Sequence, residues 1–238
     1  MKDLLEEQMN NKFIRTINLI GENNFNKLKD KHILILGLGG VGGYCLEAIA
    51  RSGINNITIV DFDRVDETNI NRQIIANINN IGEYKTEEWY KRIKSINPDC
   101  NLTIINEKID LDNIDILFKN KIDYIIDACD TILVKKQLII ECIKRNIKLI
   151  CSMGMGNKLD PSKIQITTLD KTYNDKIAKL LRKFVKDNKI KKKIMVVSST
   201  EEVIKNDYNT INSISYVPSV AGLLLASYVI NDIIKENN

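Results

Sequence analysis

A glycine-rich turn between an apolar run and a helical segment is the feature that most constrains this fold. The run Ile33 to Leu36 is apolar at every position, which is typical of a parallel strand buried on both faces. It leads directly into GLGGVG at residues 37–42, and a helical segment then extends to Ser52. Such a turn lets the backbone approach a phosphate, and the free N–H groups at the helix start attract that phosphate. The sequence therefore predicts a nucleotide site in an α/β fold, although a turn needed only for helix–strand packing would read the same.

An acidic residue follows the next strand at the spacing that dinucleotide-binding folds use. The second strand is Ile57 to Val60, and Asp61 ends it, 19 residues after Gly42. A carboxylate in this place is suited to accept hydrogen bonds from ribose hydroxyls. Up to this point the chain would also fit an NAD-dependent dehydrogenase.

A polar cluster beyond the second strand argues against a dehydrogenase. A redox site needs an apolar slot for nicotinamide, whereas acids, amides and two cations together suit a polyphosphate and a metal ion. Arginine offers a planar fork to phosphate oxygens, and lysine offers a compact charge. Each residue taken alone also fits a solvated loop or a helix cap. The cluster comprises Asp61, Asp63, Glu67, Thr68, Asn69, Asn71, Arg72, Gln73 and Lys85.

Two further acids follow another predicted strand, Tyr124 to Ile126. Asp127 and Asp130 come directly after it, and a carboxylate that faces bound phosphates is a natural ligand for Mg²⁺. The carboxyl ends of parallel strands meet at one edge of a sheet, where such folds bind ligands. We therefore expect the two polar groups to converge. Cys129 lies between the acids, and a small buried residue is a better interpretation of it than a thioester-forming nucleophile.

These motifs resemble the ATP-dependent adenylating enzymes of the ubiquitin-activating superfamily, the ThiF/MoeB/HesA group. The resemblance extends from about Phe13 to Ile234. Two stretches, DPSKIQ at residues 160–165 and SSTE at 198–201, resemble in particular the branch that dehydrates threonylcarbamoyladenosine in tRNA. The shared pieces are FIRT at 13–16, GLGGVG at 37–42, VDFD at 60–63, TNINRQ at 68–73, Gly82 with Lys85, INP at 96–98, IDACD at 126–130, and Pro218-Ser219-Val220 with Gly222.

The resemblance implies a Rossmann-like, mostly parallel sheet flanked by helices, with ATP and Mg²⁺ as cofactors. Asp61 would hold the ribose, Asp130 the magnesium ion, and Arg15 would reach the site of a partner subunit in a homodimer. The implied phosphate contacts are Asn69, Arg72 and Lys85. The whole implied site comprises Gly37, Gly39, Gly40, Gly42, Asp61, Asp63, Asn69 and Gln73 for the nucleotide, with Arg15, Arg72, Lys85 and Asp130 for catalysis.

Departures from the family pattern bear on the substrate. The position of the family's first N-terminal arginine holds Lys12, and the further arginine that relatives often carry near Asn18 is absent. The paired Cys-x-x-Cys motifs of the relatives that activate small proteins are absent, so no structural zinc is expected. The resemblance favours tRNA as substrate. Two alternatives are the C-terminal carboxylate of a ubiquitin-like sulfur carrier, which would bring sulfur-transfer proteins in as partners, and a nucleotide-binding protein without catalysis.

The order of predicted elements suggests a single ThiF-type domain over residues 1–238. It would comprise a helical arm at 1–30, a Rossmann-like core at 31–152, and an antiparallel extension with a C-terminal helix at 153–238. The apolar run Val217 to Ile234 predicts a buried or dimer-interface helix rather than a membrane span, because its uncharged stretch is too short to cross a bilayer. Predicted helices are Glu83 to Ser95, Thr131 to Arg145 and Asn174 to Lys186, and further strands are Leu102 to Ile105, Leu149 to Cys151, Ile164 to Leu169 and Ile194 to Val197.

Charge is distributed unevenly along the chain. The whole sequence carries +4, but Lys171 to Lys193 holds ten basic and two acidic residues, a local +8. This segment is either a solvated lysine-rich face or a contact for the tRNA backbone, and the resemblance favours the contact. Five scattered cysteines and a polar N-terminus without a signal-peptide pattern favour a cytoplasmic enzyme.

Overall fold

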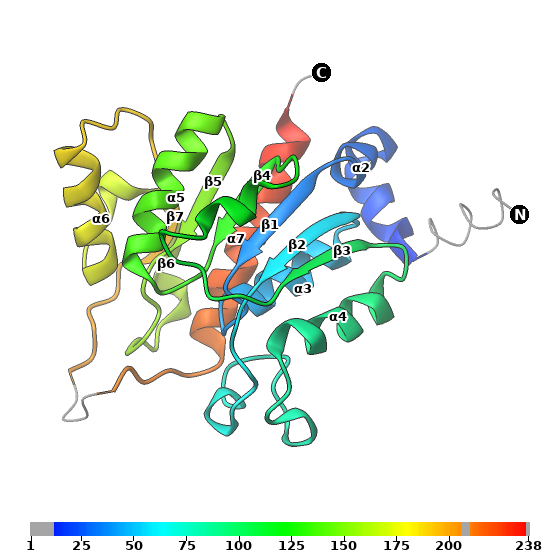
Figure 1. Ribbon diagram of the computed structural model, residues 1–238, viewed down its shortest axis with the longest axis horizontal. Helices are drawn as coiled ribbons and strands as arrows, with labels where there is room; N and C mark the ends of the chain where they lie inside the picture. Colours follow the sequence, from blue (N-terminus) through cyan, green and yellow to red (C-terminus); the bar gives the residue numbers. More distant parts are fainter. Residues whose placement is uncertain (1–11, 206–209, 237–238) are drawn as a thin grey trace, which may run out of the picture.

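A seven-stranded sheet runs through the computed structural model, which describes residues 12–205 and 210–236. Its strand order is β3-β2-β1-β4-β5-β7-β6, and every neighbouring pair is parallel except β6 with β7 (Figure 1). The strands are β1 (His32–Leu36), β2 (Asn56–Val60), β3 (Asn101–Ile105), β4 (Tyr124–Asp127), β5 (Lys148–Ser152), β6 (Ile164–Thr168) and β7 (Met195–Ser199). The predicted α/β fold class is confirmed.

Helices cover both faces of the sheet, because alternate residues of each strand point to opposite sides. Ile33 and Ile35 of β1 pack with helices α2, α3, α4 and α7 in one cluster. Leu34 and Leu36 pack on the other face with α5, and α6 adds a third cluster beside β5 and β7. The helices are α2 (Glu22–Lys29), α3 (Gly42–Arg51), α4 (Lys85–Ile96), α5 (Ile132–Arg145), α6 (Lys176–Asp187) and α7 (Tyr216–Lys235), and residues 12–20 are also helical.

The C-terminal helix α7 meets the length and apolarity of a membrane-crossing helix, yet much of it is core. Val217, Ala221, Leu225, Val229 and Ile233 are almost fully buried and repeat at the spacing of one helix face. α7 packs directly on α3: a Cβ added to Gly222 would lie only 2.2 Å from the carbonyl oxygen of Val41. Only glycine permits this close approach, so the helix is a structural wall behind the glycine turn.

Several predicted element boundaries and one predicted strand arrangement differ from those observed in the structure. β7 extends the parallel sheet by pairing with β5, so only the outermost strand β6 is antiparallel. The helix expected from Glu83 begins at Lys85, because Tyr84 is extended and pairs with Arg64 in an isolated bridge. The first eleven residues of the predicted helical arm lie outside the described part of the chain.

Candidate functional site

A cavity of about 300 Å³ opens at the carboxyl ends of β1, β2 and β4. β1 lies between β2 and β4, so the strand order reverses at this point, and open α/β sheets bind ligands in such crevices. The cavity therefore has the position expected of the predicted nucleotide site. It is lined by Leu36, Gly37, Gly39, Gly40, Val60, Asp61, Phe62, Asp63, Asn69, Arg72, Gln73, Lys85, Glu107, Lys108, Ile109, Ala128, Cys129, Asp130, Thr131 and Val134.

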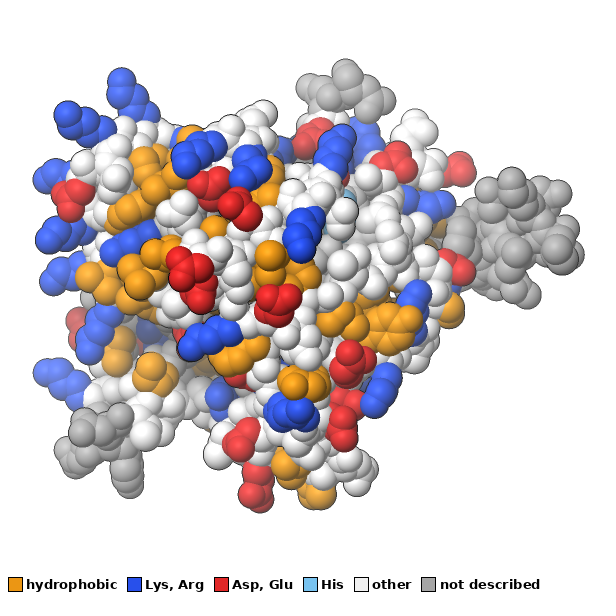
Figure 2. Space-filling view, in the orientation of Figure 1, with side chains coloured by type: hydrophobic (Ala, Val, Ile, Leu, Met, Phe, Trp, Pro, Cys, Tyr) orange, Lys and Arg blue, Asp and Glu red, His pale blue; other side chains and the backbone are white. Residues whose placement is uncertain are grey.

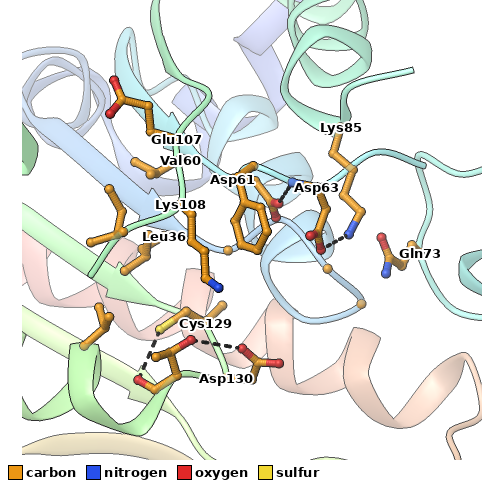
Figure 3. Close-up of a pocket in the computed structure, with 18 of the residues that line it drawn as sticks. Leu36, Val60, Asp61, Asp63, Gln73, Lys85, Glu107, Lys108, Cys129 and Asp130 are labelled. Atoms are coloured by element: carbon orange, nitrogen blue, oxygen red, sulfur yellow. Dashed lines mark hydrogen bonds and ion pairs between the residues drawn. The ribbon is translucent and has the colours of Figure 1, made fainter. Parts of the chain in front are cut away.

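The lining divides into an apolar half and a polar half. Leu36 and Val60 lie on one side, while Lys85 and Gln73 lie on the other, with Asp61 between them (Figure 3). A planar base suits the first half, a polyphosphate suits the second, and a ribose would lie at the middle. This division predicts how a bound nucleotide would be oriented in the cavity, with its base in the apolar half and its phosphates in the polar half.

The glycine turn contributes three of its four glycines to the cavity. Gly37, Gly39 and Gly40 line it, and a Cβ on Gly39 would have nothing closer than 3.9 Å, so its backbone is open to a ligand. Gly42 does not line the cavity. A Cβ on Gly42 would lie 1.8 Å from the carbonyl oxygen of Gly37, so this glycine allows α3 to start against the turn. Gly42 thus has a packing role in this structure, and its contact with a ligand stays a prediction.

Asp61 is held by the backbone of the two neighbouring turns. Its Oδ2 accepts a hydrogen bond from the N–H of Leu38 at 2.6 Å, and its Oδ1 accepts one from Asp63 N–H at 2.8 Å. Burial raises the pKa of the Asp61 carboxyl, while Lys85 and these backbone donors act in the opposite direction. The carboxylate is thereby fixed to one place between the two halves of the cavity.

Lys85 is buried and neutralised by a carboxylate in the polar half. Its Nζ lies 2.8 Å from Oδ2 of Asp63, and its side chain is only 5% exposed whereas that of Asp63 is 49% exposed. Lys85 is the first residue of α4 rather than a loop residue, so its stem is packed while its charge faces the cavity (Figure 3). Because Asp63 is half-exposed, Lys85 can exchange this carboxylate for a phosphate oxygen when a ligand binds.

Arg72 and Asn69 come from the short 3₁₀ helix η1 (Glu67–Asn69) and the turn after it. Asn69 closes a capping box by accepting from Asp66 N–H, which fixes its side chain at the cavity wall. Arg72 donates to Thr68 O at 2.7 Å and to Asn71 Oδ1 at 2.9 Å.

The neighbouring Gln73 has a buried Oε1 for which no protein partner is present among the described residues. A buried amide oxygen without a partner costs free energy, so it is a position where a ligand donor would be favourable.

The two predicted acids after β4 have different surroundings. Asp127 is fully buried and pairs with Lys135 at 3.0 Å, so it cannot face bound phosphates. Asp130 is exposed at the cavity wall, where Thr131 donates to it at 3.4 Å. Burial raises the pKa of the intervening Cys129 thiol, which disfavours a thiolate nucleophile. The described residues hold no group of three or more His, Cys, Asp or Glu that could bind a metal ion alone.

Arg15 is exposed on the helical residues 12–20 and is not part of the cavity of its own chain. Its neighbour Lys12 forms an ion pair with Asp99, just before β3, which places this helix at the amino-terminal edge of the sheet. Arg15 and the cavity thus lie at opposite edges of one subunit. The remaining predicted residues of the polar cluster that stay outside the cavity are Glu67, Thr68 and Asn71.

The basic segment folds as α6 and the loop that joins it to β7. Nine of its ten cations are exposed, Arg182 is half-buried, and none forms an ion pair within residues 12–205 and 210–236. Figure 2 shows Lys and Arg side chains gathered along the edge of the molecule that α6 forms. Asp175 caps α6 through Ala178 N–H and also accepts from Gly154 N–H, directly after β5. α6 therefore starts at the edge of the sheet that holds the cavity.

Sequence reasoning missed Phe62, Glu107, Lys108 and the apolar residues of the cavity. Phe62 stands between two acids that the sequence motifs indicate, so its place beside the ligand could have been inferred. Lys108 follows the edge strand β3 without any motif. Only the strand register, which aligns Val60 with Ile105, brings this loop to the site.

Comparison with known proteins gives a consistent set of similarities. Residues 13–238 match the sequence model of the ThiF family. The chain is 38% identical over 245 residues to a Bacillus subtilis (strain 168) protein named tRNA threonylcarbamoyladenosine dehydratase, covering 96% of each chain. It is 37% identical over 211 residues to the protein of the same name from Escherichia coli (strain K12), covering 86% of this chain and 79% of that one.

A solved structure also matches nearly the whole chain. The crystal structure of the E. coli tRNA N6-threonylcarbamoyladenosine dehydratase in complex with ATP aligns with a TM-score of 0.88 and 34% identity, covering 94% of both chains. The seven-stranded arrangement and the long C-terminal helix thus belong to a known architecture.

Proposed function

This chain is a member of the ThiF family, and we propose that it carries out the ATP-dependent, cyclising dehydration of threonylcarbamoyladenosine in tRNA. The observation that carries the proposal is the cavity at the strand switch, whose apolar half, central carboxylate and cationic half suit ATP from base to phosphates. The choice of substrate is supported by the similarity of most of the chain to proteins named as dehydratases.

The chemistry begins with the carboxylate of the modified nucleoside. A carboxylate is a poor electrophile because its leaving group would be oxide. One carboxylate oxygen attacks the α-phosphorus of ATP, the bond to the β-phosphate oxygen breaks, and pyrophosphate leaves. A nucleophile within the modification then attacks the acyl carbon, and AMP departs with the former carboxylate oxygen. The net change is the loss of one water from the nucleoside and the conversion of ATP to AMP and pyrophosphate.

The residues of the cavity position the reactants and balance charge, which is the main protein contribution to phosphoryl-group chemistry. Asp61 accepts from the ribose hydroxyls, and the glycine turn offers backbone N–H groups to the phosphates. Arg72, Lys85 and Asn69 hold the phosphate oxygens as negative charge moves to the departing pyrophosphate. In this account Gln73 and Asp63 complete the polar wall.

Magnesium fits this site through one carboxylate. Mg²⁺ keeps several waters and binds nucleotide sites through one or two carboxylates plus phosphate oxygens, so a dedicated protein cage is not needed. Of the two acids after β4, Asp130 is exposed at the cavity wall, whereas Asp127 is buried and paired with Lys135. Asp130 would hold the ion, which neutralises charge on the phosphates when bound.

The tRNA contact in this proposal is α6. The helix starts at the same edge of the sheet as the cavity and extends about 18 Å for its 12 residues. Its lysines and those of residues 189–193 therefore form a track that leads away from the reacting end. An RNA stem can follow such a track through its phosphates while one modified nucleoside enters the cavity.

A homodimer in the cytoplasm is part of the same proposal. Arg15 lies far from the cavity of its own subunit, so it can reach a site only if a second subunit brings one to it. The exposed side of α7, which includes Leu223, offers apolar surface near the glycine turn for such an assembly.

The test is incubation of the purified protein with ATP and tRNA that carries threonylcarbamoyladenosine, followed by nucleoside mass analysis. We expect a nucleoside lighter by one water, formed together with AMP and pyrophosphate. Activity on the rival substrate would appear instead as ATP–pyrophosphate exchange that depends on a ubiquitin-like carrier and is indifferent to tRNA. Unchanged nucleosides in the tRNA experiment would reject the proposed function.

A further inference from the structure

Phe62 and Lys108 form a pair at the apolar half of the cavity that the proposed mechanism does not use. The Nζ of Lys108 lies 5.5 Å from the centre of the Phe62 ring, within the range of a cation–π contact. Phe62 lies two residues beyond Val60, and Lys108 lies three residues beyond Ile105. Since Val60 and Ile105 are register partners, both side chains project beyond the same point of the sheet.

The backbone beneath both side chains is fixed. The turn that carries Phe62 is held by the hydrogen bond from Asp63 N–H to Asp61, and the carbonyl of Lys108 accepts from Asn113 Nδ2 at 2.9 Å. The next residue, Ile109, is buried among the side chains beneath the cavity. An exposed pair on a fixed backbone is thus presented to the cavity rather than carried on a loose loop.

The charge of Lys108 is not balanced by a protein acid. Lys85, the cation of the polar half, pairs with Asp63, whereas Lys108 has no ion pair within the described ranges. Figure 3 shows Lys108 on the side of Leu36 and Val60, with its amino group directed across the cavity toward Cys129. Phe62 is 47% exposed beside it. An unpaired cation and a half-exposed ring therefore face the end where a base would lie.

We propose that Phe62 and Lys108 close the base end of the ATP site and that Lys108 recognises the nucleobase rather than the phosphates. The ammonium group donates to a ring-nitrogen acceptor of adenine while the phenyl ring covers an apolar edge of the nucleoside. This inference rests on the proposed ATP site. It adds a specificity contact from Lys108, which lies outside every sequence motif.

The two ends of a nucleotide give different signatures in binding. Removal of a base contact weakens adenosine, AMP and ATP by the same factor, because all three carry the same base. Removal of a phosphate contact leaves adenosine unchanged and weakens ATP most. Arg72 lies in the polar half, so its replacement should give the opposite pattern of affinities within the same protein.

The experiment measures the affinity of the full-length protein for adenosine, AMP and ATP by calorimetric titration, without tRNA. We expect Lys108→Met to weaken all three by a common factor of about ten, and Phe62→Leu by a common factor of about two to ten. Lys108→Arg keeps the cation and should recover most of the affinity. Lys119→Met removes an exposed lysine that does not line the cavity and serves as the charge-matched control.

Unchanged affinities in Lys108→Met, or a weakening that grows with the number of phosphates, would overturn the inference. Thermal unfolding of each variant excludes a general loss of structure. A parent protein that binds no adenine compound would overturn both this inference and the proposed function. A parent that binds them but leaves tRNA unmodified would reject only the proposed dehydratase activity, and the pattern across the three ligands would still decide the role of Lys108.

Discussion

Lys135 and Asp127 form an ion pair in which both side chains are completely hidden from solvent, with 3.0 Å between Nζ and Oδ2. Lys135 also donates to Ser152 O at 3.0 Å, and the other oxygen of Asp127 accepts from Cys129 N–H at 3.2 Å. Burial is the largest single influence and favours the neutral amine, but attraction to Asp127, together with Cys129 and Cys151, raises the pKa of Lys135. The pair joins the end of β4, the first turns of α5 and the end of β5. It thereby supports the segment after β4 that carries Asp130.

We predict that Asp127→Asn lowers the free energy of unfolding by about 3–5 kcal/mol, because it leaves a buried ammonium group without its counter-ion. Urea denaturation at neutral pH measures the change. Asp130→Asn, the same substitution three residues later at an exposed position, is the matched control and should change stability by less than about 0.5 kcal/mol. Equal stability of the two variants would show that the buried pair contributes nothing.

Asp130→Asn should instead raise the magnesium concentration needed for half-maximal turnover. The proposed ion has one protein carboxylate, and its replacement by an amide removes that charge. Steady-state rates across a magnesium titration, at saturating ATP and tRNA, measure the shift. Superimposable titrations of variant and parent would reduce Asp130 to a hydrogen-bond acceptor at the start of α5.

Replacement of Arg72 or Lys85 by alanine should remove most activity while the fold persists. Each charge-assisted contact to phosphate contributes roughly 1.5–3 kcal/mol, or about ten- to a hundredfold or more in rate. The Lys85 variant leaves Asp63 unpaired, but this acid is half-exposed and can be hydrated. Circular dichroism checks the fold and pyrophosphate release checks the activity. Wild-type turnover in both variants would contradict the phosphate assignment.

Mixed subunits should test whether Arg15 acts in the neighbouring site. At a magnesium concentration that saturates the parent but is too low for Asp130→Asn, the Arg15→Ala and Asp130→Asn homodimers are each expected to be inactive. Subunit exchange creates dimers in which one site has both groups intact, so activity should return to a fraction of the parent value. Mass spectrometry of differently tagged subunits confirms the exchange. Demonstrated exchange without any recovery of activity would argue against shared sites.

Replacement of Lys189, Lys191, Lys192 and Lys193 by glutamine should reduce the salt dependence of tRNA binding. The slope of log affinity against log salt should shrink by roughly 0.7–0.9 for each phosphate that the variant no longer neutralises. ATP affinity should stay at the parent value, because these lysines do not line the cavity. A parent protein whose tRNA affinity is insensitive to salt would remove the basis for α6 as the contact.

The sequence was sufficient for those parts of the fold that local chemistry decides. The apolar runs predicted β1, β2 and β4, and the glycine turn with Asp61 predicted where the cavity would open. The predicted helix Glu83 to Ser95 corresponds to α4, in which Trp89 and Ile93 are buried on one helix face. Each of these signals is contained within a few neighbouring residues.

Features decided by long-range packing could not be read in the same way. Asp127 and Asp130 have the same side chain, and only the position of Lys135 on α5 makes the first structural and leaves the second exposed. The parallel direction of β7 depends on its insertion between β5 and β6. Lys108 reaches the cavity only through the pairing of β3 with β2.

The contact between Gly222 and the start of α3 has a consequence for how the protein is made. The glycine turn leaves the ribosome early, but the helix that supports it from behind is synthesised some 180 residues later. A nascent chain therefore contains the GLGGVG turn before the α7 helix that packs against it. A ligand stabilises by mass action the state that binds it, and the contact between Gly222 and α3 is present only in the finished protein. The support of the glycine turn is therefore complete only after α7 has been synthesised and has docked.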